Sequence, residues 1–203
     1  MELLERDYEV LKNLSKWRFL LGNHIEVLCD FSSSRTMYRR LKVLIDNKFI
    51  EKKKILYGVP SIYTLSHKGL VLLGLNKRKD IIRIDMISHN IHVIDTLVYL
   101  VKTNVITDID SIKSEKELNR EVGFGSRKHQ PDFIFNKDSN TYAVEVELSI
   151  KGIDKLEKNI KDNFITYDNQ IWVVEKKNNK VERNIKSFMT KYPNISILYL
   201  EDF

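Results

Sequence analysis

The sequence predicts an α+β protein in which a small basic helical unit with a β-hairpin precedes an α/β domain with a mixed sheet. Charge is divided unevenly, since residues 1–80 hold 16 Lys and Arg against 9 Asp and Glu, whereas residues 81–203 hold 18 against 19. Helical spacing of apolar residues prevails in the first part, and helix and strand patterns alternate in the second. The charge run at residues 76–80 marks the expected boundary between domains 1–78 and 79–203.

The composition is that of an ordinary globular protein, with 42% hydrophobic and 31% charged residues in a chain of 203. No apolar run approaches the roughly 18 residues of a membrane span, so no membrane association is expected. The N-terminus, MELLERDYEV, is acidic and amphipathic, unlike a signal peptide. The lone Cys29 excludes an internal disulfide and favours a reducing, cytoplasmic setting.

The first part reads as helix, turn, basic helix and hairpin. Residues 6–14 have helical spacing, and Asn23 can cap a second helix that carries Ile25. The polar turn after Phe31 leads into the basic helix MYRRLKVLIDNKFI. A basic turn at residues 51–54, a strand at 61–65 and a short helix from Ser66 follow.

The phrases YRRLKVLIDNKFIEKK and YTLSHKG resemble the recognition helix and wing of a winged helix-turn-helix, over residues 5–75. The resemblance implies binding to double-stranded DNA, commonly as a homodimer on a palindrome. A solvated charged face and a winged helix that binds only proteins are the alternatives. The residues implied to contact the major groove, the base edges or the DNA backbone are Ser33, Arg35, Thr36, Arg39, Arg40, Lys52, Lys53 and Lys54.

The second part begins with a long helical pattern over residues 81–101 and a strand over 105–110. Two β-rich runs, 133–135 and 142–148, flank a polar turn and predict a hairpin. A helix at 150–164, a strand from Gln170, a helix at 180–189 and a strand from Ile195 complete the pattern. This order predicts a mixed sheet whose later strands are joined by crossovers.

Two polar segments leave alternatives open. His89, His92 and Asp95 recur every three residues along one side of the first helix, which suits a metal or a nucleic-acid backbone, but packing through hydrogen bonds is favoured. GFGSRKHQ, at residues 123–130, is favoured as a flexible loop over a phosphate site formed by Arg127, Lys128 and His129.

The segment PDFIFNKDSNTYAVEVELSIK carries the strongest chemical signal. Glu145 and Glu147 lie two residues apart, so in a strand they share a face, and hairpin pairing brings Asp132 near Glu145. Clustered carboxylates repel one another unless a cation lies among them, and hard oxygen ligands suit Mg²⁺ or Mn²⁺. An edge strand with one wet face gives the same alternation and is the alternative.

This arrangement resembles the PD-(D/E)xK nuclease core. The resemblance implies that Asp132 and Glu145 hold Mg²⁺, which polarises the phosphodiester and activates a water. Its third position, usually lysine, is Glu147 here, a departure that some restriction-type members share, and Lys151 is the nearest substitute cation. Glu115 matches the acidic residue that many members carry near the first strand, although the sequence does not separate it from Glu117.

The combination of YRRLKVL, LSHKG, HNIHVID and PDF…EVELSIK resembles the replication-relaxation family of plasmid and mobile-element proteins over nearly the whole chain. The resemblance implies a role in replication, relaxation or transfer of DNA, with replication or relaxosome proteins as partners. Three hypotheses stay open: a DNA-binding protein with an Mg²⁺-dependent endonuclease core, a non-catalytic accessory protein or repressor whose core serves dimerisation or docking, and a protein-protein adaptor.

Overall fold

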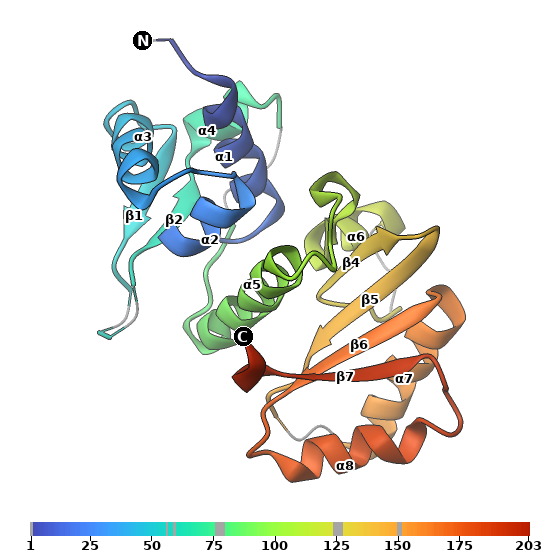
Figure 1. Cartoon of the computed structure of the whole chain (residues 1–203). Coiled ribbons are helices and arrows are strands. Elements are labelled where there is room, and N and C mark those ends of the chain that lie inside the picture. The colour runs from blue at the N-terminus through green and yellow to red at the C-terminus, as the bar shows by residue number, and fades with distance from the viewer. Residues whose placement is uncertain (1, 56, 59, 76–79, 124–127, 150–151) are drawn as a thin grey trace. The chain divides into compact units, whose positions relative to one another are not determined.

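The computed structural model describes residues 2–55, 57–58, 60–75, 80–123, 128–149 and 152–203 (Figure 1). The chain divides into two compact units, Met1–Ile94 and Asp95–Phe203. The division falls inside helix α5 (Ile87–Lys102), so one helix contributes a half to each unit. Each unit is therefore described by itself.

The first unit contains a helical group and a two-stranded sheet. Strands β1 and β2 are antiparallel, with Ile50 opposite Leu65 and Lys53 opposite Ile62. The lysines expected in a basic turn thus begin inside a strand, because Glu51–Lys53 belong to β1. The elements are α1 (Glu5–Lys16), α2 (Gly22–Leu28), α3 (Ser34–Asp46), β1 (Ile50–Lys53), β2 (Ile62–Leu65), α4 (His67–Leu72) and the 3-10 turn η1 (Ile84–Met86).

The core of the first unit forms because each helix presents an apolar stripe inward. Leu11 and Leu14 of α1 and Leu41 and Leu44 of α3 are at most 1% exposed, as expected for residues spaced three apart on one helix face. The start of α2 lies close to α3, since a Cβ at Gly22 would lie 2.8 Å from the Tyr38 hydroxyl oxygen and would displace that side chain. These contacts fix α3 against the other two helices.

The second unit is built on a five-stranded mixed sheet in the order β3-β4-β5-β6-β7. The pairs β3–β4 and β4–β5 are antiparallel, whereas β5–β6 and β6–β7 are parallel. The sequence prediction of helices followed by a mixed-sheet α/β domain is confirmed at this level. The elements after α5 are the 3-10 turn η2 (Ile109–Ser111), β3 (Lys113–Ser114), α6 (Glu115–Val122), β4 (Phe133–Lys137), β5 (Asn140–Val146), α7 (Ile153–Thr166), β6 (Asn169–Val174), α8 (Asn179–Phe188), β7 (Ile195–Tyr199) and the 3-10 turn η3 (Leu200–Asp202).

The strand predicted for residues 105–110 is wrong. Asp108 Oδ1 accepts hydrogen bonds from the backbone N–H groups of Asp110 and Ser111, which closes a turn instead of an extended segment. Helix α6, for which the sequence prediction had no element, begins with a capping box in which Ser114 and Glu117 bond to each other's backbone N–H. The edge strand β3 is consequently only two residues long.

The register of β5 and β6 determines which layer Glu145 faces. Glu145 lies opposite Trp172 on β6, and residues paired in this way share a face of the sheet. That face forms a core with α7 and α8, in which Leu156, Ile160 and Ile185 are at most 2% exposed. Glu145 therefore faces the layer to which α7 belongs. None of the helices in the described ranges combines the length and apolar character that a membrane span requires.

Candidate functional site

The first predicted surface surrounds the N-terminus of α3. Ser33 is the N-cap: its Oγ accepts a hydrogen bond from the Thr36 backbone N–H at 3.3 Å and donates one to Thr36 Oγ1 at 3.1 Å. Both side chains thus stabilise the start of the helix. Arg35 and Arg39, the basic residues of this turn and the next, are exposed.

Arg40 differs from its two neighbours. Its guanidinium donates to both carboxylate oxygens of Asp7, with Nε 3.0 Å from Oδ1, and Asp7 is completely buried. Asp7 in turn accepts the Leu4 backbone N–H at the start of α1. Because a bidentate ion pair fixes the guanidinium, Arg40 links α1 to α3, and the DNA contact that the sequence assigns to it stays a prediction.

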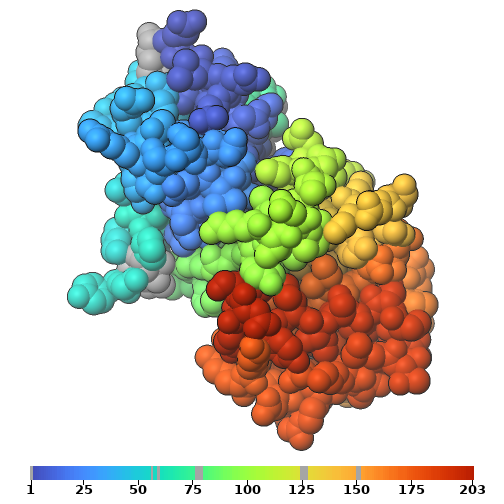
Figure 2. Space-filling model, viewed as in Figure 1, coloured from blue at the N-terminus to red at the C-terminus, as the bar shows by residue number. Residues whose placement is uncertain are grey.

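The lysines of the hairpin lie on the surface. Lys52, Lys53 and Lys54 are all exposed. Lys53 Nζ lies 2.9 Å from Glu51 Oε2, and Lys52 Nζ lies 6.0 Å from the centre of the Tyr63 ring. Exposed ion pairs of this kind contribute little to stability, so a polyanion can compete for these ammonium groups. In the space-filling view the cyan residues of the hairpin project from the surface of the first unit (Figure 2).

The phrase LSHKG has a structural role. Ser66 Oγ caps α4 by accepting the Gly69 N–H at 3.0 Å and donates to the Lys48 carbonyl at 2.6 Å. A Cβ at Gly69 would lie 2.4 Å from the Phe49 carbonyl oxygen, so only glycine fits there. Lys68 donates to the Asn47 carbonyl and lies 4.3 Å from the Phe49 ring centre. These residues connect the hairpin to α3 and α4.

The second predicted site lies where β4 and β5 pair. Phe133 is opposite Val144, which places Asp132 beside Glu145 at the same end of the hairpin. The Asp132 carboxylate accepts the Val146 backbone N–H at 2.8 Å, and its negative charge raises the pKa of Glu145. The two acidic residues therefore lie next to each other at this end of the hairpin.

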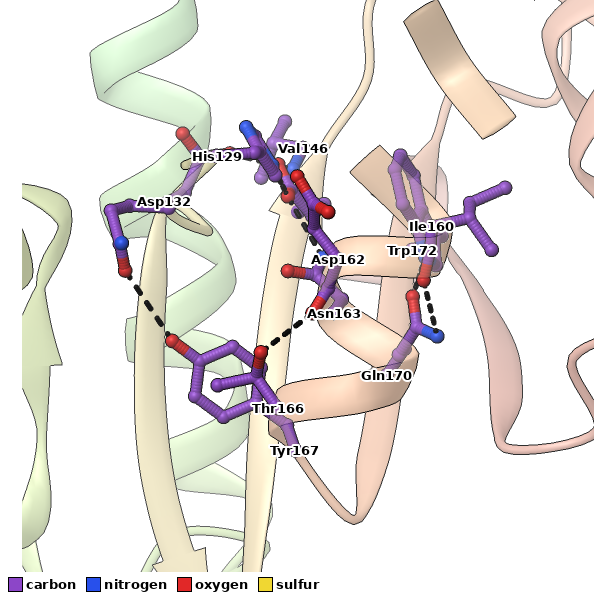
Figure 3. A network of polar contacts seen from close by, with 12 residues as sticks. His129, Asp132, Val146, Ile160, Asp162, Asn163, Thr166, Tyr167, Gln170 and Trp172 are labelled. Atoms are coloured by element: carbon purple, nitrogen blue, oxygen red, sulfur yellow. Dashed lines mark hydrogen bonds and ion pairs between the residues drawn. The ribbon is translucent and has the colours of Figure 1, made fainter. Parts of the chain in front are cut away.

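Glu145 is the most constrained of the acidic residues. It is 4% exposed, and burial is the main reason why its pKa is raised, with the Asp132 charge acting in the same direction. Its Oε1 contacts His129 Nε2 and accepts a hydrogen bond from Asn163 Nδ2 at 3.0 Å. Both contacts lower the pKa, but burial outweighs them. Figure 3 shows His129, Asp132 and Asn163 together in this polar network.

Glu147 is buried as well, at 3% exposed. Its Oε1 lies 3.4 Å from both the backbone nitrogen and the Oγ of Ser149, and its backbone N–H donates to the Val173 carbonyl at 2.9 Å. The alternative of an edge strand with a wet face does not fit, because β5 lies between β4 and β6 and both glutamates are covered.

The other predicted catalytic residues have different positions. The Glu115 backbone N–H donates to the Asp132 carbonyl at 2.8 Å, whereas the Glu117 carboxylate caps α6. Of these two acidic residues, Glu115 is thus the one directly linked to Asp132. Lys151 lies outside the described residues, as does Arg127 of the expected phosphate loop.

His129 and Asn163 belong to the site but were not predicted as site residues. The sequence named His129 only in a phosphate loop, and Asn163 sits on the buried face of α7, 18 residues after Glu145. A polar residue among Leu156, Ile160 and Phe164 was the available signal, since buried amides need partners.

The donor set suits a hard cation. Within the described ranges, no group of three or more His, Cys, Asp and Glu side chains is arranged to hold a metal ion. Asparagine is not one of these four residue types, and its amide oxygen is also a ligand for Mg²⁺ and Ca²⁺. Asn163 Oδ1 is buried and has no hydrogen-bond partner. Asp132, Glu145 and Asn163 therefore present oxygen atoms of the right chemical type.

Comparison with known proteins does not assign a family. No protein-family model matches the chain, and a search of curated proteins also gives no match. The functional argument consequently depends on the residues of the two sites.

Proposed function

We propose that this chain is a DNA-binding protein with a nuclease-like core, acting in replication, relaxation or transfer of a plasmid or mobile element. In this proposal the first unit is a winged helix-turn-helix that binds double-stranded DNA. The second is a PD-(D/E)xK-like domain that binds Mg²⁺ or Mn²⁺ and cleaves a DNA strand. The observation that carries the proposal is the meeting of Asp132 and Glu145 at one end of the β4–β5 hairpin.

Basic residues of the first unit support the DNA-binding half. Arg35 and Arg39 lie one helical turn apart on α3 and are exposed, as are the three lysines of the hairpin. Each phosphate neutralised by such a group releases counterions, which makes the affinity depend on salt. Arg40 is already held by its ion pair with Asp7, so Arg35 and Arg39 are the better residues for a test of binding.

The core residues support a hydrolytic role. A divalent cation bound there would polarise a phosphodiester and lower the pKa of a bound water. Asp132 and Glu145 would bind the cation, and Asn163 and His129 hold the Glu145 carboxylate in place. Glu147, the residue directly after β5, adds a further carboxylate.

The second candidate function is a non-catalytic DNA-binding accessory protein or repressor. It is favoured by the contacts that already occupy Glu145, because His129 and Asn163 satisfy Oε1 without any cation. The core would then serve dimerisation or docking of replication or relaxosome proteins.

Binding and cleavage are tested separately. The Arg35→Ala/Arg39→Ala variant should bind duplex DNA at least about 10-fold more weakly in fluorescence anisotropy. Its plot of log affinity against log salt should be flatter by about 0.9 for each lost phosphate contact. Lys177→Ala/Lys180→Ala removes two exposed charges from the second unit and is the matched control. If both variants bind DNA with the affinity of wild type, the predicted DNA contacts are wrong, and the hypothesis of a protein-protein adaptor is favoured.

Cleavage is measured on supercoiled plasmid DNA with Mg²⁺, Mn²⁺ or EDTA. Metal-dependent nicking that is lost in Asp132→Asn and Glu145→Gln supports the endonuclease. Tight binding without nicking under any of these conditions supports the accessory protein.

A further inference from the structure

The side-chain amide of Asn163 makes a hydrogen bond through its nitrogen but not through its oxygen. Asn163 is fully buried on α7, and its Nδ2 donates to Glu145 Oε1 at 3.0 Å. Its Oδ1 is also buried, yet it accepts no hydrogen bond. Leaving a buried acceptor unsatisfied costs about 1–3 kcal/mol, so such an atom in a folded protein requires an explanation.

Rotation of the amide does not remove this cost. When Glu145 is ionised, the opposite orientation would place Oδ1 against Glu145 Oε1, so that two acceptor oxygens would face each other. Glu145 therefore fixes which atom of the amide is left over. The leftover atom is an oxygen, held by a side chain that contacts the acidic residue at the centre of the site.

The surrounding charges indicate what this oxygen binds. Asp132 lies opposite Glu145 where β4 and β5 pair, and its carboxylate accepts the Val146 backbone N–H at 2.8 Å, so the negative charges of two neighbouring acidic groups repel one another at this end of the hairpin. A neutral hydrogen-bond donor would satisfy Asn163 Oδ1 but leave this repulsion in place. A cation would offset the repulsion and could be coordinated by the Asn163 oxygen at the same time.

We propose that Asn163 Oδ1 is a third oxygen ligand, contributed by helix α7, for a divalent cation shared with Asp132 and Glu145. This inference rests on the proposed metal-binding core and deepens it, because it names a ligand outside the β4–β5 hairpin. Carboxylate and amide oxygens make the site selective for hard cations such as Mg²⁺ or Mn²⁺ over cations that prefer nitrogen or sulfur ligands.

Mn²⁺ binding to the full-length protein tests the inference, with free Mn²⁺ measured by electron paramagnetic resonance. Wild type should bind one ion per chain, and Asn163→Ala should weaken the dissociation constant at least about 10-fold. The matched control is Asn159→Ala. Asn159 is the same residue type, one turn earlier on α7, and 5% exposed, and its variant should stay within about 3-fold of wild type.

A second variant covers the case in which Asn163→Ala does not fold. Asn163→Asp keeps an oxygen ligand but places a further negative charge beside Glu145, so its melting temperature should rise more on addition of Mn²⁺ than that of wild type. An Asn163→Asp protein with no Mn²⁺-dependent rise would overturn the inference, as would Mn²⁺ binding to Asn163→Ala with wild-type affinity.

The result also separates this inference from the proposed function. Wild type that binds Mn²⁺ independently of Asn163 keeps the metal core and refutes only the α7 ligand. Wild type that binds no Mn²⁺ at millimolar concentration refutes both, while duplex DNA binding by the first unit still reports on the other half of the proposed function.

Discussion

The two units treat charge in opposite ways. In the first unit the basic residues of α3 and β1 lie on the surface, and Arg40 is the exception because it is paired with a buried carboxylate. In the second unit Glu145 and Glu147 are only 4% and 3% exposed: both lie alongside β6, and Asn163 of α7 contacts Glu145. Exposed charges add affinity for a charged ligand at little cost in stability, whereas buried carboxylates cost stability unless a partner neutralises them.

The largest change in stability is expected at Arg40. Arg40→Ala leaves Asp7 buried without its main partner, which should lower the free energy of unfolding by about 3–5 kcal/mol in urea denaturation. Arg39→Ala, on the same helix but exposed, should change it by less than about 0.5 kcal/mol. If the two variants are equally stable, the Asp7–Arg40 pair is not the link between α1 and α3.

Replacement of Glu145 is expected to raise the stability of the protein instead of lowering it. Burial raises the pKa of Glu145 in the folded protein, whereas in the unfolded chain this pKa keeps its ordinary value of 4.5. As the pH rises from 4.5 towards the folded-state pKa, ionisation favours the unfolded chain, so Glu145 lowers the stability of the folded protein. Glu145→Gln should thus raise the melting temperature at pH 8 by about 2–4 °C, corresponding to about 1 kcal/mol, measured with EDTA present. The gain should disappear near pH 4.

Glu182→Gln is the control for that measurement. Hydrogen bonds from Lys186 and Tyr199 lower the pKa of the partly buried Glu182 carboxyl, so its replacement should give no gain at pH 8. A Glu145→Gln protein that melts below wild type at pH 8 would show that the His129 and Asn163 contacts outweigh the cost of burial.

An effect smaller than that of Arg40→Ala is expected from the helix cap in LSHKG. Ser66→Ala removes the cap of α4 and the bond to the Lys48 carbonyl, so it should cost about 1–2 kcal/mol in urea denaturation. Ser33→Ala removes an exposed cap and should cost less. The reverse order would mean that the contact between α4 and the hairpin contributes little.

The smallest effect is expected at Cys29, whose thiol should not be alkylated in the folded protein. Burial, and secondarily the charge of Glu9, raises its pKa to about 12. Since the thiolate is the reactive form, the native protein should resist iodoacetamide at pH 8, with labelling followed by mass spectrometry. The unfolded protein should label fully, and rapid native labelling would indicate that the first unit opens locally.

Local signals predicted much of this fold. The alternation in residues 133–148 and the polar turn between the two runs suffice to predict the hairpin and the approach of Asp132 to Glu145. The error at residues 105–110 arose because Asp108 bonds to the backbone two and three residues later, which competes with strand formation. Apolar spacing alone does not report that competition.

Long-range pairs were beyond reach of the sequence. Arg40 and Asp7 are 33 residues apart, and nothing in the basic run distinguishes Arg40 from Arg39 until α1 is packed against α3. Asn163 reaches Glu145 only once α7 has crossed back over the sheet. Both residues acquire their roles from tertiary packing.

The two-residue connection between β4 and β5 bears on the order of folding. Asp138 and Ser139 both have positive φ, the twist that suits a tight hairpin, so these strands can pair locally. The parallel pairing of β5 with β6 must wait for the whole α7 crossover. Asp132 and Glu145 would accordingly meet in water first, and a cation or a proton could reach them before the helix arrives and closes off the solvent.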